Sequence, residues 1–574
     1  MIVRATLLAG VLLALAPASA LAHAVLEASS PARGARLDAA PREVGLRFDE
    51  PVEASFGALR VFDARGREVQ RGEPFRPGGS ARRVAVKLQP GLGAGGFTAT
   101  YRVISADAHP VAGGFVFTFG DGGAPAQTVG ELLGDDAGPV TATAFAVVRA
   151  IQYGAIAIAL GALAFLLLAW APALRALAGA GRGPAGPAGA ARGSTWAAAD
   201  AAFARGLGRL LLAVAAAGLL SALAGLVLQG ATAGSTSAWA ALDADVLDAV
   251  LATRFGGVWG AGALAWAAVL IGALAVPPGA ALLPPLLALA LLPALGGHAG
   301  VQPPVALNAP ANVLHVLAVS VWLGGVAVLV LVLRGATREL GPADRTRALA
   351  AAVGRFSALA GIAIAVLLAT GVLQAVLGIS VPRELLDTAY GRAVLVKLAL
   401  LAAIVGLGAV NRRRLLPRLR RATGAPGAAG VALRRTLRAE AALAVVVLGT
   451  TGALAGYPPA DTVAAGPFAT DVRIGPARLD VTVEPARTGP NELHLYLFDR
   501  ATGRQYDATK ELTVRAELPG KRIAPIELTP RRAGPGHYVV SGAPFGVAGD
   551  WRVEVAARVS EFDEHRARFE LPIR

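Results

Sequence analysis

The sequence predicts three parts in one chain: an all-β domain, a central all-α membrane domain of eight helices, and a second β-sandwich. Three observations support this mixed multidomain class. The 574 residues are 55% apolar and have a mean hydropathy of +0.55, so at least one part is expected to lie in lipid. Apolar runs of about 20 residues are confined to the middle of the chain. The two flanking segments instead alternate apolar and polar residues between turns rich in Gly, Pro and Asp.

Residues 1–22 are typical of a secretory signal peptide. Arg4 supplies a positive charge, residues 7–17 form an apolar stretch, and Ala20-Leu21-Ala22 is a small-x-small cleavage site. The alternative, a retained membrane helix, is weaker because the apolar stretch is short and polar sequence follows at once. Cleavage after residue 22 would make His23 the first residue of the mature chain.

Residues 23–120 are predicted to form a β-sandwich, followed by a linker over 121–142 that is rich in Gly, Ala, Pro and Asp. Short alternating runs recur there at intervals typical of sandwich strands. The predicted strands are 44–48, 58–62, 83–88, 97–103 and 115–119.

Residues 143–457 are predicted to cross the membrane eight times. A helix of about 20 apolar residues spans about 30 Å of hydrocarbon. The fourth run is the weakest, because it is short and is interrupted by three prolines. The predicted spans are 144–171, 207–229, 255–276, 280–297, 311–333, 354–378, 391–410 and 437–456.

The net charge of +15, from 54 basic and 39 acidic residues, predicts the orientation of these spans. The basic excess lies in three Arg-rich segments, 175–209, 334–355 and 412–438, and such loops are typical of the cytoplasmic side. Eight spans place all three segments inside and both termini outside. We therefore expect a multi-pass protein of the inner (plasma) membrane, with the lipid bilayer and not nucleic acid as its surroundings.

Residues 465–574 alternate again and are predicted to form a second β-sandwich on the outer side. Three histidines, His494, His537 and His565, lie in separate parts of this domain. We expect them to be ordinary surface residues.

The composition limits the metal chemistry. The chain has no Cys and only Met1, so a metal site must use nitrogen and oxygen, which suits Cu(II), Ni(II) or Zn(II) better than Cu(I). A terminal His23 offers its α-amine and ring Nδ1 to one ion, and this favours Cu(II). After the strand at 97–103, Asp107 and His109 are two residues apart, so on an extended chain they point to the same side. Taken alone, such a pair is more often a surface turn.

The first domain resembles CopC, a periplasmic copper-binding β-sandwich of the Ig/cupredoxin-like type. The resemblance covers 23–119 and implies that His23, Asp107 and His109 bind Cu(2+), with Glu50 at the position of an acidic residue near or at the site in some members. A Met-rich Cu(I) site, present in some CopC proteins, is not expected because the methionines are absent. The motifs that carry the resemblance are His23-Ala24-Val25-Leu26, Ser29-Ser30-Pro31-Ala32, Phe48-Asp49-Glu50-Pro51, Ser105-Ala106-Asp107-Ala108-His109-Pro110 and Gly113-Gly114-Phe115.

The membrane part resembles CopD, the inner-membrane partner of CopC, and the last domain resembles the YtkA-like domains found in some CopC/CopD fusions. The CopD resemblance rests on looser motifs: His315-Val316-Leu317, Trp322-Leu323-Gly324-Gly325, Tyr390-Gly391-Arg392, Lys397, Asn411-Arg412 and Glu440.

Five residues are candidates for a path through the membrane: His315, Trp322, His298, Lys397 and Glu440. His315 and Trp322 are seven apart and share a helix face. Ionisable groups at membrane depth are costly and often mark a pathway.

Each ionisable candidate also has a structural alternative. For His315 it is a hydrogen bond between helices, and for His298 a place in a loop. Lys397 could extend its amine to the membrane surface, and Glu440 could pair with Arg435 or Arg438.

Together these features predict a non-enzymatic copper-binding membrane protein for copper uptake, homeostasis and resistance. The outer domain would capture Cu(II), with periplasmic copper donors as candidate partners, and the membrane domain would pass copper on. The alternatives are sequestration or sensing without transport, and a copper-dependent oxidative enzyme. No GxGxxG, Walker or HExxH pattern stands in a suitable context for nucleotide or zinc enzymology.

Overall fold

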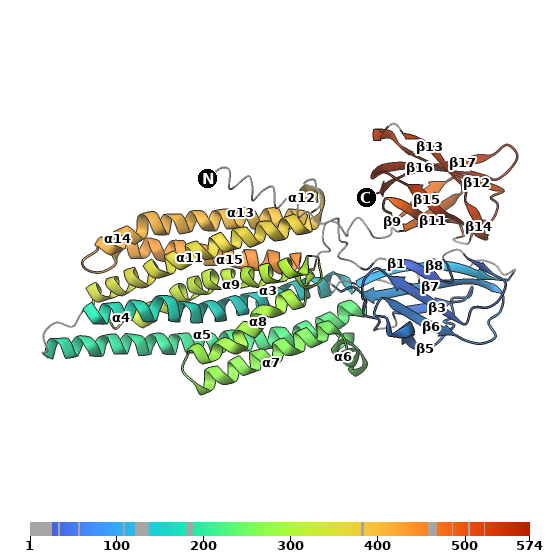
Figure 1. Cartoon of the computed structure of the whole chain (residues 1–574). Coiled ribbons are helices and arrows are strands. Elements are labelled where there is room, and N and C mark those ends of the chain that lie inside the picture. Colours follow the sequence, from blue (N-terminus) through green and yellow to red (C-terminus); the bar gives the residue numbers. More distant parts are fainter. Residues whose placement is uncertain are drawn as a thin grey trace. The chain divides into compact units, whose positions relative to one another are not determined.

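A computed structural model of the chain describes residues 24–573 except 25, 33–34, 56–57, 107–109, 121–131, 133–136, 181–186, 303, 380–383, 457–467, 485, 503–504 and 522. The predicted signal peptide and most of the predicted linker therefore lie outside the described residues. The chain divides into a helical unit, Ala137–Pro458, and a β unit made of Leu21–Asp136 and Pro459–Arg574. This order of β, helical and β segments confirms the predicted fold class (Figure 1).

The N-terminal β segment forms two four-stranded sheets, with buried aromatic and branched side chains such as Phe48, Phe115 and Phe117 in its core. All five predicted strands are present. Three further strands were missed, because β1 and β5 lack regular alternation and β2 has two residues. One sheet has the order β1 (Leu26–Ser30), β3 (Glu43–Phe48), β6 (Arg83–Leu88) and β5 (Gln70–Phe75); the other has β2 (Arg36–Leu37), β8 (Pro110–Phe119), β7 (Gly95–Ile104) and β4 (Leu59–Phe62).

The C-terminal segment also forms two sheets, around a core that includes Leu495, Val553 and Trp551. The five-stranded sheet has the order β14 (Arg531–Gly534), β15 (His537–Phe545), β11 (Gly489–Asp499), β10 (Ala477–Glu484) and β9 (Phe468–Ile474). The four-stranded sheet has the order β13 (Ile523–Leu528), β12 (Glu511–Leu518), β16 (Gly549–Arg558) and β17 (Glu564–Ile573).

The expectation that His494 and His537 lie on the surface is wrong. Their exposed fractions are 3% and 0%. The two rings stack with each other and with Tyr496, with centroid distances of 5.5 Å between the histidines and 4.1 Å between Tyr496 and His537. These residues lie on the side of the sheet opposite Leu493 and Leu495, and their three rings are stacked there. His565 is partly exposed, as expected.

The helical unit contains seven described helices that are long and apolar enough to cross a membrane. The fourth predicted run forms a shorter apolar helix, α8, which fits its low length and its prolines. The long helices are α3 (Gly138–Phe165, continued by a π-helical turn and α4, Ala171–Ala180), α5 (Pro187–Ala233), α7 (Arg254–Ala275), α9 (Val305–Leu331), α11 (Pro342–Gly378), α13 (Ala389–Val410) and α15 (Gly427–Leu454). The shorter ones are α6 (Ala244–Leu251), α8 (Leu283–Leu295), α10 (Leu333–Thr337), α12 (Glu384–Asp387) and α14 (Leu416–Arg421).

Glycines allow the central helices to touch. A Cβ at Gly161 of α3 would lie 1.8 Å from the Ser320 carbonyl oxygen of α9, and one at Gly324 would lie 2.5 Å from Gly161 Cα. On α5, Gly218 makes room for the Trp266 ring of α7, 2.3 Å from the position of a Cβ. Small residues at such crossings let helix backbones pack closely in membranes.

Three buried polar side chains hold α3, α5 and α7 together. Ser221 donates to Gln152 Oε1 at 2.6 Å, and the Trp266 indole donates to the same oxygen at 3.2 Å. Each of the three residues is at most 5% exposed.

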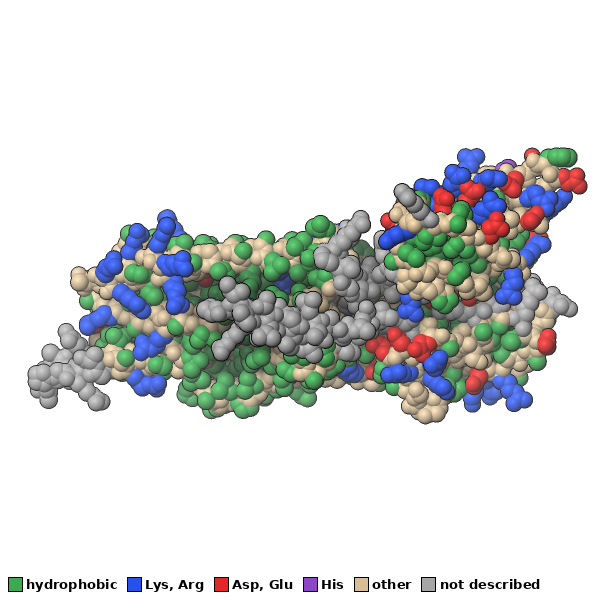
Figure 2. All heavy atoms as spheres, turned by 45° about the horizontal axis from the view of Figure 1, so that its top comes forward, with side chains coloured by type: hydrophobic (Ala, Val, Ile, Leu, Met, Phe, Trp, Pro, Cys, Tyr) green, Lys and Arg blue, Asp and Glu red, His purple; other side chains and the backbone are tan. Residues whose placement is uncertain are grey.

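The three Arg-rich segments come together at one end of the helical unit. Thr346, in the second segment, donates to the carbonyl oxygen of Gly424, in the third, at 2.6 Å. A small cluster joins Leu340 and Ala348 to Trp196, which lies within the first segment. Lys and Arg side chains gather at this end, beside α4 and α14, and apolar side chains cover the middle (Figure 2). The short helix α8 packs against both α7 and α9, its neighbours in the chain.

Apolar side chains face outward on the long helices, as expected for contact with lipid. Examples are Leu264 at 75% and Ile271 at 65% on α7, and Val376 at 68% on α11. The helical unit therefore has the surface of a multi-pass membrane domain.

Candidate metal site and membrane path

The predicted outer ligands lie mostly outside the described residues. His23, Asp107 and His109 are not described, whereas Glu50, directly after β3, is. Glu50 Oε1 accepts a hydrogen bond from the backbone N–H of Ala106 at 3.1 Å. The carboxylate thus holds the residue that precedes Asp107.

Three described segments that flank the predicted ligands meet at one end of the N-terminal sandwich. Leu26 of β1 pairs with Phe48, two residues before Glu50. Ile104, the last residue of β7, bridges Glu53 in both directions, with N–O distances of 2.8 and 3.1 Å. Ala24, next to His23, is 3% exposed and belongs to the core of this sandwich.

In the helical unit, the path candidate His315 of α9 makes a hydrogen bond to α11. Its Nδ1 lies 2.9 Å from Oγ1 of Thr370, which is 7% exposed on α11. Helix α9 begins six residues before the predicted span at 311, so His315 lies ten residues from its first residue, about 15 Å along the axis. His315 therefore lies deeper in its helix than the predicted span 311–333 implied.

Polar side chains that the sequence analysis did not select continue this contact between α9 and α11. Asn312 Nδ2 donates to Gln374 Oε1 at 3.2 Å, and Gln374 Nε2 donates to the carbonyl oxygen of Thr370, also at 3.2 Å. Asn312 and His315 are three residues apart on α9, so they lie one turn apart. The polar spacing of Asn308, Asn312 and His315 within an apolar helix was the signal available in the sequence.

The other membrane candidates, Trp322, Lys397 and His298, lie in three different surroundings. Trp322 is 5% exposed and packs in the apolar core of the helical unit. Lys397 lies on α13. His298 lies in a helical turn between α8 and α9, a loop position as its alternative reading expected.

Glu440 pairs with an asparagine and not with Arg435 or Arg438, the structural alternative considered for it. Its Oε1 accepts a hydrogen bond from Asn411 Nδ2 at 2.7 Å, and Asn411 Oδ1 accepts one from Thr436 at 2.5 Å. Glu440 is 4% exposed, and α15 directs its side chain toward the π-helical turn after α13. The carboxyl group is thus part of a buried polar contact between two helices.

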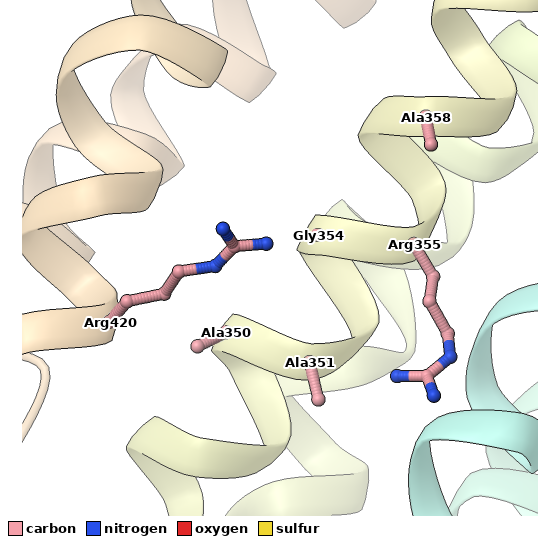
Figure 3. Close-up of a pocket in the computed structure, with 6 residues that line it drawn as sticks. All are labelled: Ala350, Ala351, Gly354, Arg355, Ala358 and Arg420. Carbon is pink, nitrogen blue, oxygen red and sulfur yellow. The ribbon is translucent and has the colours of Figure 1, made fainter.

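A hollow of about 400 Å³ opens at the Arg-rich end, between α11 and α14 (Figure 3). In this view, Arg420 points toward Gly354, and Arg355 points away from Arg420. Apart from these two arginines and Gly354, the hollow is lined by alanines. It therefore offers two cationic side chains and no metal-binding group. A copper ion would be repelled there, and the polar contact around His315 is the better candidate for a path.

The buried histidine pair of the C-terminal sandwich forms a separate polar cluster. His494 Nδ1 lies 3.2 Å from His537 Nε2, and His494 Nε2 lies 2.9 Å from Glu492 Oε1, an ion-pair distance without hydrogen-bond alignment. Burial and the neighbouring His494 lower the pKa of His537 well below its usual value. Among the described residues, no group of three or more His, Asp or Glu side chains is arranged to hold a metal ion.

Comparison with known proteins identifies the family. Three family models match the chain in order: the CopC domain over residues 26–120, the copper resistance protein D-like N-terminal domain over 140–306, and copper resistance protein D over 350–454. The matched residues end before the C-terminal sandwich, so its YtkA-like nature stays a prediction.

Individual relatives match either most of the chain or about one sixth of it. Copper transport protein CutJ of Bacillus subtilis (strain 168) is 28% identical over 467 residues, which cover 79% of this chain and 77% of that protein. Protein YobA of Escherichia coli (strain K12) is 29% identical over 97 residues, 17% of this chain and 78% of that protein. The crystal structure of CopC from Methylosinus trichosporium OB3b is 29% identical, covers 17% of this chain and 93% of that chain, and gives a TM-score of 0.16.

The matched families concern copper resistance and transport and are not enzyme families. Two of them cover most of the long apolar helices, with α9 almost entirely outside both, which agrees with a multi-pass membrane protein. The chain therefore belongs to the copper resistance CopC/CopD family.

Proposed function

We propose that this protein takes up copper: its N-terminal domain captures Cu(II) outside the membrane, and its helical unit passes copper inward. The observation that carries the proposal is the meeting of three segments, around Ala24, Glu50 and Ala106, which adjoin the predicted ligands His23 and Asp107 in the sequence. It is supported by a polar contact around His315 inside the attached helical unit.

The proposed outer site uses the α-amine and ring of His23 with Asp107 and His109. These nitrogen and oxygen donors favour Cu(II), and the chain has no thiol to favour Cu(I). Glu50 would act by positioning, because its carboxylate already accepts the Ala106 N–H. The proposed domain limits follow the same scheme: signal 1–22, copper domain 23–120, linker 121–142, membrane domain 143–457 and outer sandwich 465–574.

The proposed orientation places both β domains outside. Its support is the meeting of the three Arg-rich segments at one end of the helical unit, since positive loops stay on the cytoplasmic side. The His315 contact then lies on the route from the outer site to the cytoplasm.

The outer site is tested by inserting one alanine ahead of His23 in the mature chain. The insertion keeps an amine and an imidazole but separates them, so they no longer close one chelate ring. Cu(II) titration of the purified full chain should show most of the affinity lost. Glu27→Gln, an exposed change four residues away, is the matched control and should bind like the unmodified chain. Equal affinity of the inserted and unmodified chains would refute the terminal chelate.

The inward step is tested by His315→Ala. Cells that carry this variant should accumulate less copper than cells with the unmodified protein, at fixed external copper and equal protein level. Leu314→Ala is the matched control, because Leu314 is 51% exposed on the same helix. Sequestration without transport predicts that His315→Ala leaves copper uptake unaltered.

A further inference from the structure

We infer that Thr370 and Gln374 of α11 fix the hydrogen positions on α9, so that His315 Nε2 and Asn312 Oδ1 present free lone pairs to copper. This inference rests on the proposed function, because it names how the same path would bind its ion. It adds two positioning residues and one oxygen ligand that the sequence analysis did not select.

The Thr370 hydroxyl donates its proton to a backbone carbonyl of its own helix. Thr370 Oγ1 lies 2.8 Å from the carbonyl oxygen of Val366, one turn earlier on α11. Two oxygens at this distance need a proton between them, and a carbonyl has none, so the hydroxyl donates to Val366. The hydroxyl has only that one proton and is left as an acceptor toward His315.

The bond to Thr370 determines which ring nitrogen of His315 carries the proton. Its Nδ1 lies 2.9 Å from Thr370 Oγ1, and the proton of this bond must come from the ring. A neutral imidazole with its proton on Nδ1 has its lone pair on Nε2. Hydrogen bonding of one ring nitrogen commonly orients the other nitrogen for a metal in this way.

The hydrogen bonds also fix the orientation of the Gln374 and Asn312 side-chain amides. Gln374 Nε2 faces the Thr370 carbonyl oxygen, which can only accept, so Gln374 Oε1 must face Asn312. Asn312 therefore turns its NH₂ group toward Gln374. Its Oδ1 is buried and has no hydrogen-bond partner among the described residues. Thr370 thus acts twice, through its hydroxyl on His315 and through its carbonyl on Gln374.

The two free donors suit a transient site for copper. One nitrogen and one oxygen, a turn apart on α9, agree with the sulfur-free composition of the chain. Conduction needs an ion to bind and also to leave, so a site with few ligands is favourable in a path.

The test compares Thr370→Val, which removes the hydroxyl at nearly constant shape, with Thr370→Ser, which keeps it. Copper uptake is measured for the full chain in liposomes. Loss of such a supporting hydrogen bond typically costs 10–100-fold in metal affinity or activity, so the KM of Thr370→Val for copper should rise by roughly that factor. Thr370→Ser should stay close to the unmodified chain. Asn312→Leu should also raise KM, whereas Leu314→Ala should not.

A second readout reports the tautomer directly and does not depend on transport. In ¹⁵N-histidine-labelled protein, the His315 signals are those lost in His315→Asn. They should show a proton on Nδ1 in the unmodified chain and in Thr370→Ser, and a changed proton distribution in Thr370→Val. A proton on Nε2 in the unmodified chain would overturn the inference.

The two proposals fail in different ways. Unaltered uptake by His315→Ala refutes the proposed path itself. If His315→Ala abolishes uptake while Thr370→Val keeps the unmodified KM, the path stands and the inference about Thr370 is wrong.

Discussion

The Trp322-Leu323-Gly324-Gly325 motif is expected to serve packing, and Gly324→Ala tests this. Gly324 lies where α9 crosses α3, and a Cβ there would be 2.5 Å from Gly161 Cα and 2.7 Å from the Ala157 carbonyl oxygen. Both contacts are to backbone atoms, which cannot turn aside as a flexible side chain can. The added methyl group must therefore push the two helices apart.

The size of the effect follows from these distances. Carbon atoms pack best at about 3.5–4.0 Å, so the 2.5 Å contact requires a separation of roughly 1–1.5 Å. Overpacking of this kind typically costs about 1–3 kcal/mol. Alanine in place of glycine also stabilises a helix by about 1 kcal/mol, which offsets part of the loss.

Gly406→Ala on α13 isolates the cost of the clash. A Cβ at Gly406 meets nothing within 4 Å, so this variant has the same helix-forming gain without the clash. Unfolding by SDS in mixed micelles should place Gly324→Ala about 1–3 kcal/mol below Gly406→Ala. Equal stability of the two variants would refute the packing explanation. Reduced copper uptake at equal stability would then assign the motif to the path.

Two further predictions concern buried polar groups. The lowered pKa of His537 means that the unfolded chain binds a proton that the folded chain excludes, so the C-terminal sandwich should lose stability as the pH falls below about 6.5. His537→Gln should reduce this loss in unfolding experiments across pH, and an unchanged pH profile would contradict the assignment. Gln152→Leu should destabilise the helical unit by about 1–3 kcal/mol, because Ser221 and Trp266 lose a buried acceptor. Unfolding in mixed micelles measures this, and a variant as stable as the unmodified chain would show that the contact contributes little.

The sequence predicted the β strands where one face of a strand is apolar. The run 83–88 was predicted with the limits of β6, since Val84, Val86 and Leu88 recur at every second position and all three lie in the core. β1 escaped prediction because Leu26–Ser30 has one large apolar residue and is held by pairing with β3. Such pairing joins residues distant in sequence, and local periodicity does not report it.

The candidate path was predicted only in part, for a similar reason. A histidine inside an apolar run is visible in the sequence, and His315 was selected on that basis. Its partner Thr370 is 55 residues away, and no local pattern connects the two. Glu440 likewise pairs with Asn411, 29 residues earlier, and not with the neighbouring Arg435 or Arg438 that the sequence offered as an alternative.

By itself, the sequence determined which segments enter lipid, where the positive charge lies, and that a metal site must do without sulfur. These are properties of composition and of short windows, because hydrophobic transfer and charge act on each segment separately. The tertiary structure decided which polar groups meet: Glu50 with Ala106, His315 with Thr370, and His494 with His537. Hydrogen bonds act over about 3 Å, so only the packing of distant segments could bring these groups into contact.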